Sequence, residues 1–402
     1  MIETIQARIA NLPAQRRQLF AQLFDVDVTI GHALPPLEME RWVIQQFGAL
    51  EPVREQTIVK IVNRLTLESA LFNPLRARRP TQPGGPSTPI DTGQGSSSGQ
   101  AQALEEWIAR ELAEHDIFRD PERDTTADVF GRIRGQYCVT ASNVAKYAGW
   151  HGLVIFDEPH PLRFGTAQLR DYLDVALRWL AAAHARAPQA IYPIITWNCL
   201  PKSGATLMHG HMQIALTRGM HYTHVERWRR AAESYRARVG ASYFDDLFAL
   251  HAALELAIPL WAETRVFAHL TPVRNREIVF LAEPQERQAD QQPSRLGEND
   301  SLSPCLPVCL PEGFTQALCH VLRRLIDEHG MRAFNVAIAL PPLGPTLEDW
   351  RAMPIIARIA DRGDPLTTRG DMGAMELFAA NVITADPFEV AAQLRQDDKM
   401  TR

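Results

Sequence analysis

Two histidines and a glutamine occupy alternate positions in the segment His209-Gly210-His211-Met212-Gln213. Alternate side chains of a β-strand lie on one face, so the sequence predicts that His209, His211 and Gln213 point the same way. A neutral imidazole is a competent nucleophile near pH 7, because its unperturbed pKa is about 6.5. An amide donates to a phosphate oxygen without titrating. The segment fits covalent transfer of a phosphoryl-type group; a pair of metal ligands or a chance polar strand face are the alternatives.

A loop of small and polar residues precedes the histidines. It begins after Asn198 and contains Lys202, Ser203, Gly204 and Thr206. Backbone amides and hydroxyls in such a loop can approach phosphate oxygens closely, because Gly204 has no side chain in the way. The loop is therefore expected to bind phosphate.

Apolar and β-branched runs predict strands over 137–140, 152–156, 190–197 and 207–216, with a helix that begins at Thr166. This order indicates an α+β domain with an antiparallel sheet. The second half repeats the order more loosely, with strands expected over 266–270, 278–281, 333–340 and 355–359 and a helix over 314–329. We therefore expect a structural duplication.

Four segments are expected along the chain. Residues 1–79 form a helical N-terminal region, because apolar residues such as Ile5, Ile9 and Ile58, Ile61 recur at helical spacing. Residues 80–102 are rich in Gly, Pro, Ser and Thr and are expected to form a flexible loop. Residues 103–250 form the catalytic half, and 251–402 form the second half.

Composition and charge indicate a folded protein without a general affinity for polyanions. The chain has 402 residues, of which 46% are hydrophobic and 22% charged, and its net charge is −5. This balance does not favour binding to nucleic acid or to an anionic membrane. No apolar run approaches the roughly 18 residues of a membrane span, and five cysteines are an odd, sparse set unlike a disulfide framework. The cytoplasm is therefore the expected location.

The run from Asn198 to Gln213 resembles the signature of the histidine-triad superfamily. Within it, the run is similar to the branch that holds the galactose-1-phosphate uridylyltransferases and the diadenosine tetraphosphate phosphorylases, which carries an Asn, a Gly/Ser loop and then His-x-His-x-Gln. Asn73-Pro-Leu with Arg76 and Arg79 resembles the N-terminal elements of the uridylyltransferases, and Asn143 ahead of a strand-entering histidine resembles another segment. The resemblance is strongest from 137 to 216. It implies a histidine-triad-like antiparallel sheet flanked by helices, present twice.

The resemblance also assigns roles by position. It implies that His211 is the nucleophile that forms a nucleotidyl-histidine, that Gln213 contacts the phosphate and that His209 belongs to the catalytic segment. Thr206 falls where a serine usually binds the second phosphate. Substrate contacts are expected from a further set of residues: Asn198, Lys202, Ser203, Gly204, Arg76, Arg79 and Asn143. Arg369 stands near the position of a phosphate-contacting lysine.

No metal and no cofactor is expected. Many uridylyltransferases bind zinc through a Cys-x-x-Cys pair and two histidines. His160 and His209 stand where those histidines belong, but no cysteine pair precedes Tyr137. The usual His-x-His of the second half is also absent around 353–357. Zinc is therefore not expected, and we interpret Cys305, Cys309 and Cys319 as scattered thiols.

Together these features predict a nucleotidyltransferase that works by a ping-pong mechanism, like the uridylyltransferases. Its partners would be a nucleotide or nucleotide-sugar substrate and a phosphate acceptor, and a homodimer is left open. One alternative is a phosphorylase of dinucleoside polyphosphates, like the ATP adenylyltransferases, or of nucleotide sugars. Another, from a different class, is a non-catalytic nucleotide-binding protein of the same fold.

Overall fold

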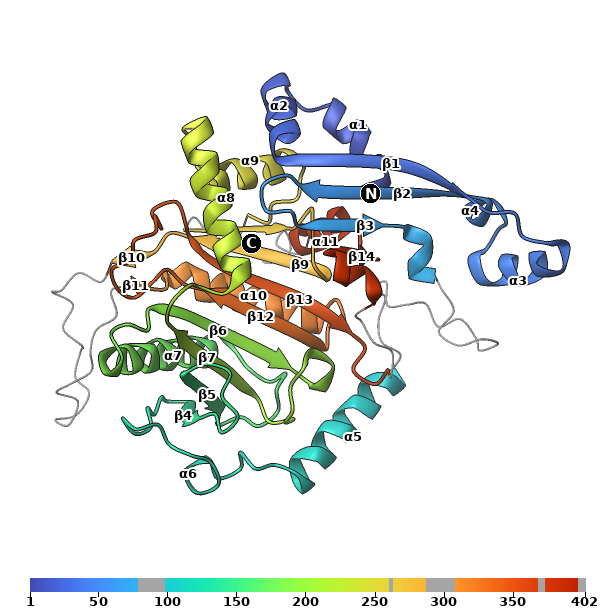
Figure 1. Ribbon diagram of the computed structural model, residues 1–402. Coiled ribbons are helices and arrows are strands. Elements are labelled where there is room, and N and C mark those ends of the chain that lie inside the picture. The colour runs from blue at the N-terminus through green and yellow to red at the C-terminus, as the bar shows by residue number, and fades with distance from the viewer. Residues whose placement is uncertain (79–97, 260–262, 287–307, 368–372, 397–402) are drawn as a thin grey trace.

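The computed structural model describes residues 1–78, 98–259, 263–286, 308–367 and 373–396. Within these ranges the strands form an eight-stranded sheet, a four-stranded sheet and a two-stranded ribbon (Figure 1). The eight-stranded sheet is antiparallel and has the order β4-β5-β7-β6-β12-β13-β9-β8. Its strands are β4 (Cys138–Ser142), β5 (Trp150–Phe156), β6 (Tyr192–Cys199), β7 (His211–Thr217), β8 (Thr264–Ala268), β9 (Asn275–Ala282), β12 (Ala333–Ala339) and β13 (Ile355–Gly363).

The large sheet consists of two halves with the same topology. The order β4-β5-β7-β6 of the first half recurs as β8-β9-β13-β12 in the second, and β6 pairs with β12 to join them. A long helix connects corresponding strands in each half: α7 (Thr166–Arg186) lies between β5 and β6, and α10 (Glu312–Asp327) lies between β9 and β12. The predicted α+β fold and its duplication are thus confirmed. We call these halves the first and the second repeat.

The two long helices pack on the sheet and on each other. α7 contacts β4, β5 and β7, whereas α10 contacts β8 and β9. Residues at helical spacing in α7, such as Leu169, Leu173, Ala176 and Leu180, are buried, as the apolar pattern predicts. The same holds in α10, where Phe314, Leu318 and Leu325 are buried. These helices bury one side of the sheet along both repeats (Figure 1).

The helical interpretation of residues 1–79 is wrong for much of that region. After η1 (Ile2–Thr4), α1 (Ile5–Ala10) and α2 (Ala14–Leu23), the chain forms β1 (Phe24–His32), α3 (Leu37–Phe47), α4 (Glu51–Arg54), β2 (Glu55–Asn63), β3 (Ser69–Phe72) and the 3-10 helix η2 (Pro74–Arg78). In β2 the buried residues Val59, Ile61 and Asn63 alternate with less buried ones. This is the period of a strand, and β-branched side chains pack well on a pleated surface.

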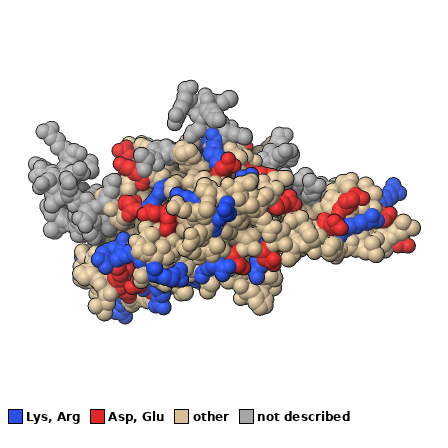
Figure 2. Space-filling model, turned by 90° about the horizontal axis from the view of Figure 1, so that it is seen from above, with Lys and Arg blue, Asp and Glu red and all other residues tan. Residues whose placement is uncertain are grey.

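The four-stranded sheet has the order β1-β2-β3-β14, in which β14 (Ala380–Ile383) pairs in parallel with β3. The ends of β1 and β2, together with α3, project from the body as an arm (Figures 1 and 2). The face seen in Figure 2 mixes acidic and basic side chains and shows no continuous field of one sign.

The remaining helices surround the two sheets. They are α5 (Ser98–Glu114), α6 (Pro121–Asp124), α8 (Thr223–Val239), α9 (Tyr243–Ala253), η3 (Pro201–Ser203), η4 (Ala374–Phe378) and α11 (Pro387–Gln396), and the ribbon consists of β10 (Gln285–Glu286) and β11 (Val308–Cys309). The loop expected over 80–102 lies outside the described residues as far as 97, and its last five residues belong to α5 instead. No helix in the described ranges is long and apolar enough to cross a membrane.

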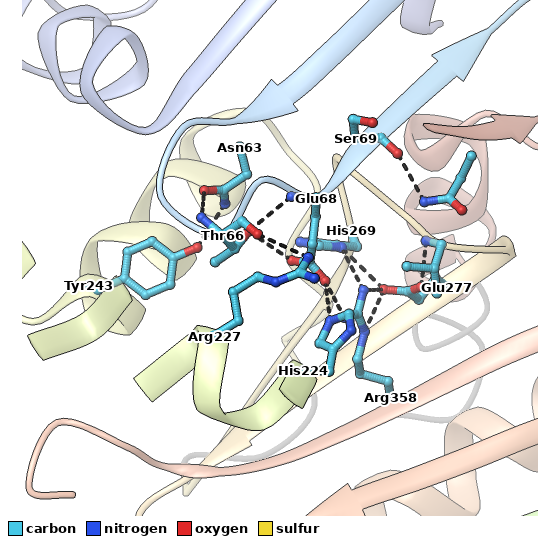
Figure 3. A network of polar contacts seen from close by, with 12 residues as sticks. Asn63, Thr66, Glu68, Ser69, His224, Arg227, Tyr243, His269, Glu277 and Arg358 are labelled. Atoms are coloured by element: carbon cyan, nitrogen blue, oxygen red, sulfur yellow. Dashed lines mark hydrogen bonds and ion pairs between the residues drawn. The ribbon is translucent and has the colours of Figure 1, made fainter. Parts of the chain in front are cut away.

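A group of polar and charged side chains, most of them buried, joins the four-stranded sheet to the second repeat (Figure 3). Glu68, between β2 and β3, contacts the guanidinium of Arg358 on β13, and that guanidinium also contacts Glu277 on β9. His224 of α8 lies 2.8 Å from the Glu68 carboxylate, and His269 lies 3.1 Å from that of Glu277. Burial raises the pKa of both carboxyls, but Arg358 and the histidines outweigh it, so both pKa values lie below the ordinary value. We call these five residues the Arg358 cluster.

Candidate active site

His211 is the first residue of β7, where it pairs with Ile155 of β5. Its Nδ1 lies 2.8 Å from the backbone carbonyl of His209. A carbonyl oxygen can only accept, so Nδ1 carries the ring proton and Nε2 keeps its lone pair. Burial lowers the pKa of His211, and the neighbouring His209 ring adds to the effect, so the imidazole is neutral near pH 7. The ring thus has the protonation state and tautomer that a nucleophile needs.

His209 does not belong to the strand that carries His211, although the sequence predicted one strand for both. The strand expected from 207 begins only at His211, and His209 lies in the bend ahead of it. Its Nδ1 contacts the carboxylate of Asp116 at 2.9 and 3.0 Å, and its Nε2 lies 2.7 Å from the carbonyl of Phe156. Both partners are acceptors, so each ring nitrogen of His209 has a hydrogen-bond acceptor beside it. His209 therefore acts on His211 through its own backbone carbonyl.

Gly210 explains why the bend fits so closely against β5. A Cβ atom at this position would lie 2.6 Å from the ring of Phe156 and 3.3 Å from the Cα of Pro161. The Gly210 amide donates to the carbonyl of Pro159, and its carbonyl accepts from the amide of Phe156. Any side chain here would push the two histidines away from β5.

Gln213 and Asn143 meet at a third residue, His151 of β5. The Gln213 Oε1 atom lies 3.0 Å from His151 Nε2, and Asn143 Nδ2 lies 3.3 Å from the same nitrogen. Lys146 reaches the same region, where its ammonium donates to the carbonyl of His151 at 2.9 Å. Sequence reasoning missed any role for His151, although its place in the motif that contains Asn143 was a signal.

The predicted phosphate loop contains the 3-10 helix η3 and then turns at Gly204, whose φ of +96° is a conformation that favours glycine. Ser203 is buried, and its hydroxyl donates to the carbonyl of Leu200, so this side chain holds the loop together. Thr206 is exposed. The Lys202 ammonium lies 3.4 Å from the carbonyl of Thr367.

The second repeat contributes to this loop through Asn335. β6 and β12 pair so that Asn198 lies opposite Asn335, whose amide donates to Asn198 Oδ1 at 2.7 Å and to the carbonyl of Ser203 at 2.9 Å. Arg362 in turn donates to Asn335 Oδ1 at 2.6 Å. Sequence reasoning missed Asn335 and Arg362. The only signal was a polar residue inside the apolar run 333–340.

Asp116 is the other residue that sequence reasoning missed. It follows α5, and its carboxylate also accepts from the backbone amide of Phe118 at 2.9 Å. The Phe118 ring packs edge-on against both His209 and His211. Asp116 and Phe118 therefore close one side of the histidine bend.

The contacts described above do not connect the arginines that were expected to bind the substrate with the residues around His211. Arg76 is an exposed residue of η2, which follows β3 of the four-stranded sheet. Arg79, Arg369 and Cys305 lie outside the described residues. Cys319 is buried in α10, and Cys309 belongs to β11.

The donor set around His209 does not fit a zinc site of the kind that the resemblance suggests. One nitrogen of His209 faces Asp116 and the other faces a carbonyl, while His160 Nε2 lies 3.2 Å from the carboxylate of Glu105. Among the described residues, no group of three or more His, Cys, Asp or Glu side chains is arranged to hold a metal. Each of the two histidines thus has a carboxylate neighbour in place of the thiolates of the site that the resemblance suggests.

Solved structures share this fold. An ADP-glucose phosphorylase from Arabidopsis thaliana, solved with bound ADP-glucose, matches with a TM-score of 0.57 at 14% identity, over 83% of this chain and 96% of that one. A GalT-like protein from the same organism matches with 0.53 at 14% identity, over 70% and 91% of the two chains. A uridylyltransferase matches with 0.52 at 13% identity, over 67% and 89%.

No protein-family model and no curated protein sequence matches the chain. Identities of 13–14% establish the fold and leave the activity open. The repeated order of four strands, the connecting helices and the structural matches agree with the resemblance of the histidine segment. The chain therefore has the duplicated histidine-triad-like fold of the uridylyltransferase branch.

Proposed function

We propose that this protein is a nucleotidyltransferase that transfers a nucleoside monophosphate through a covalent intermediate on His211. The observation that carries the proposal is the contact between His211 Nδ1 and the carbonyl of His209. It places the ring proton on Nδ1 and leaves Nε2 as the nucleophile, in a buried ring whose pKa is lowered.

The reaction consists of two displacements at the same phosphorus. Nε2 attacks the α-phosphorus of a nucleotide donor, a bond from nitrogen to phosphorus forms, and the bond to the bridging oxygen breaks, so that a phosphorylated product leaves. The acceptor phosphate then attacks the same phosphorus, and the bond to Nε2 breaks. Throughout, the proton stays on Nδ1 and is donated to the carbonyl of His209, and this hydrogen bond stabilises the positive ring of the intermediate. Gln213 would donate to a non-bridging oxygen.

Nucleotide sugars are the proposed donors, since the matches include an ADP-glucose phosphorylase with its substrate bound and a uridylyltransferase. The acceptor is then either a sugar 1-phosphate or inorganic phosphate. The second candidate, a nucleotide-sugar phosphorylase, is favoured by the match that covers 96% of the ADP-glucose phosphorylase.

The test is to trap the intermediate. The protein is incubated with UDP-, ADP- and GDP-linked sugars that carry a labelled α-phosphate, and is then denatured in alkali. We expect an acid-labile label on wild type, and a loss of about 10³-fold or more in His211→Ala, because the nucleophile is gone. His115→Ala is the matched control, since His115 is an exposed histidine whose ion-pair partner is Glu111. Equal labelling of His211→Ala, or no label with any donor, would contradict the proposal.

The acceptor is identified from the same labelled protein. Inorganic phosphate discharges the label as a nucleoside diphosphate if the protein is a phosphorylase. Hexose 1-phosphate discharges it as a nucleotide sugar if the protein is a uridylyltransferase-like enzyme.

A further inference from the structure

The orientation of the Gln213 amide decides whether it helps or hinders a phosphate. The NH2 end of the amide donates to an oxygen, whereas the carbonyl end repels it. The two ends have nearly the same shape, so packing alone does not select one of them. A polar neighbour must therefore fix the amide.

His151 is that neighbour. The backbone amide of Tyr147 points at its Nδ1 at 3.4 Å, so Nδ1 accepts and the ring proton lies on Nε2. Nε2 then donates to Gln213 Oε1 at 3.0 Å. The side-chain carbonyl of Asn143 accepts from the backbone amide of Ala145 at 2.9 Å, so Asn143 turns its NH2 group toward His151. Two donors do not bond each other, so the 3.3 Å contact between Asn143 Nδ2 and the protonated Nε2 is not a hydrogen bond, and the shorter contact, to Gln213 Oε1, is the one that Nε2 makes. The carbonyl end of Gln213 is thus held at His151, and its NH2 end is turned away from it.

The ring is suited to this task because it stays neutral. His151 is buried, and burial lowers its pKa despite the hydrogen bond to Gln213; the ammonium of Lys146 lowers it further. A neutral ring keeps one proton, which the contacts above place on Nε2.

The second repeat contains the same arrangement at the corresponding positions. Gln213 lies opposite Leu153 in β5, which lies opposite Ala141 in β4. Likewise, Arg358 lies opposite Val279 in β9, which lies opposite Phe267 in β8. Position 213 therefore corresponds to 358, 151 to 277 and 143 to 269.

The backbone confirms this correspondence. The Asn143 amide donates to the carbonyl of His151 at 3.0 Å, and the His269 amide donates to that of Glu277 at 3.1 Å. In each repeat the middle side chain contacts both of the others: Glu277 contacts His269 and Arg358 (Figure 3). His151 of β5 and Glu277 of β9 thus occupy equivalent positions in the two repeats. His151 holds Gln213 of β7 through a hydrogen bond, and Glu277 holds Arg358 of β13 through an ion pair.

We infer that His151 is a positioning residue that fixes Gln213 with its NH2 group toward the phosphate of the substrate. This inference rests on the proposed function. His151 itself does not touch the substrate, since its Nε2 is committed to Gln213. It determines which end of Gln213 the phosphate meets.

The test compares His151→Asn with His151→Leu, two side chains of similar shape of which only Asn can donate to Gln213. In single-turnover labelling we expect His151→Leu to be slower by about 10²-fold, the effect of losing one donor to the transition state, with little change in the KM of the donor. His151→Asn should recover much of this loss. The double variant His151→Leu/Gln213→Leu should be no slower than Gln213→Leu alone, because both changes remove the same interaction.

Three outcomes would overturn the inference. They are a wild-type labelling rate in His151→Leu, an equal loss in His151→Asn and His151→Leu, and losses that multiply in the double variant. Urea unfolding of each variant excludes a folding defect. Nitrogen NMR of the free protein gives a result that needs no substrate: the His151 proton is expected on Nε2. A proton on Nδ1 refutes the inference even if no donor labels the protein, whereas a proton on Nε2 without labelling refutes only the proposed function.

Discussion

Replacing Arg358 by methionine would remove the guanidinium that contacts both carboxylates of the Arg358 cluster. Glu68 and Glu277 are both buried, and each contacts this guanidinium. Removing one member of a buried ion pair typically costs about 3–5 kcal/mol, because the partner is left charged and desolvated. Proteins of this kind are stable by roughly 5–15 kcal/mol, so the loss is a large part of the total.

The pH dependence of this loss distinguishes the explanation from simple loss of packing. In the wild type both carboxyl pKa values are lowered, so their contribution is present above the unfolded pKa and is lost as the pH falls below it. In Arg358→Met only the histidines oppose burial, which is the largest single influence on both carboxyls, so we expect the folded pKa to rise above the unfolded value. The folded variant then binds more protons than its unfolded state, so its stability falls as pH rises. For one such proton the slope is about 1.4 kcal/mol per pH unit.

The assay is urea unfolding of the wild type and Arg358→Met at pH 6 and pH 8. We expect the stability difference between them to grow by about 2–3 kcal/mol over these two pH units, for one proton. Arg351→Met is the matched control, since Arg351 is an exposed arginine that pairs with Asp349, and its effect should be small and independent of pH. The reasoning is refuted if Arg358→Met loses no more than this control, or if it loses the same amount at both pH values.

Two further predictions concern other buried groups. Asp116→Asn removes the charge that faces His209, so the bend should loosen; we expect labelling of His211 to slow by about 10-fold, and unchanged labelling would contradict this. Asp120→Asn, at a half-exposed carboxylate of the same segment, serves as its control. Burial lowers the pKa of His251 to about 3, so its neutral form stabilises the fold above pH 6.5 and this stability is lost as the pH falls. From pH 7.5 to pH 5 the free energy of unfolding should drop by about 2 kcal/mol through this group, and in His251→Gln that part of the drop, measured by urea unfolding, should disappear.

Local patterns were sufficient to predict most of the large sheet. Runs such as Gly152–Phe156 and Ala190–Trp197 are apolar and β-branched, and they form β5 and β6 with small shifts at the ends. The histidine segment was singled out by its residue types and spacing together with its resemblance to a known signature, and its role stays a prediction. The duplication was also predictable, because the second repeat keeps the order of its elements.

Contacts between distant segments were not predictable from one sequence. Asp116 and His209 are separated by 93 residues, and Asn198 and Asn335 by 137. No local periodicity indicates such pairs. The late start of β7 has the same origin, because the bend before His211 is set by contacts with β5 rather than by local preference.

The N-terminal region shows a different reason for failure. In β2 the spacing of Ile58, Ile61 and Val62 fits a helix, and only the partner strand β1 reveals the alternation of a sheet. The β-branched residues favour a strand, whereas the spacing of the apolar residues favours a helix. Pairing with β1 makes the segment a strand.

The pairing of β6 with β12 makes the folded state of the first repeat dependent on the second, whether or not the second takes part in a reaction. If the second repeat were removed, β6 would become an unprotected edge that exposes the backbone groups now bonded to β12, from Ile194 to Cys199. The second repeat, which has Ile356 where the first has His211, thus acts as a permanent cover for that edge. A repeat that carries no histidine at this position can therefore still be required for the folded state of the other.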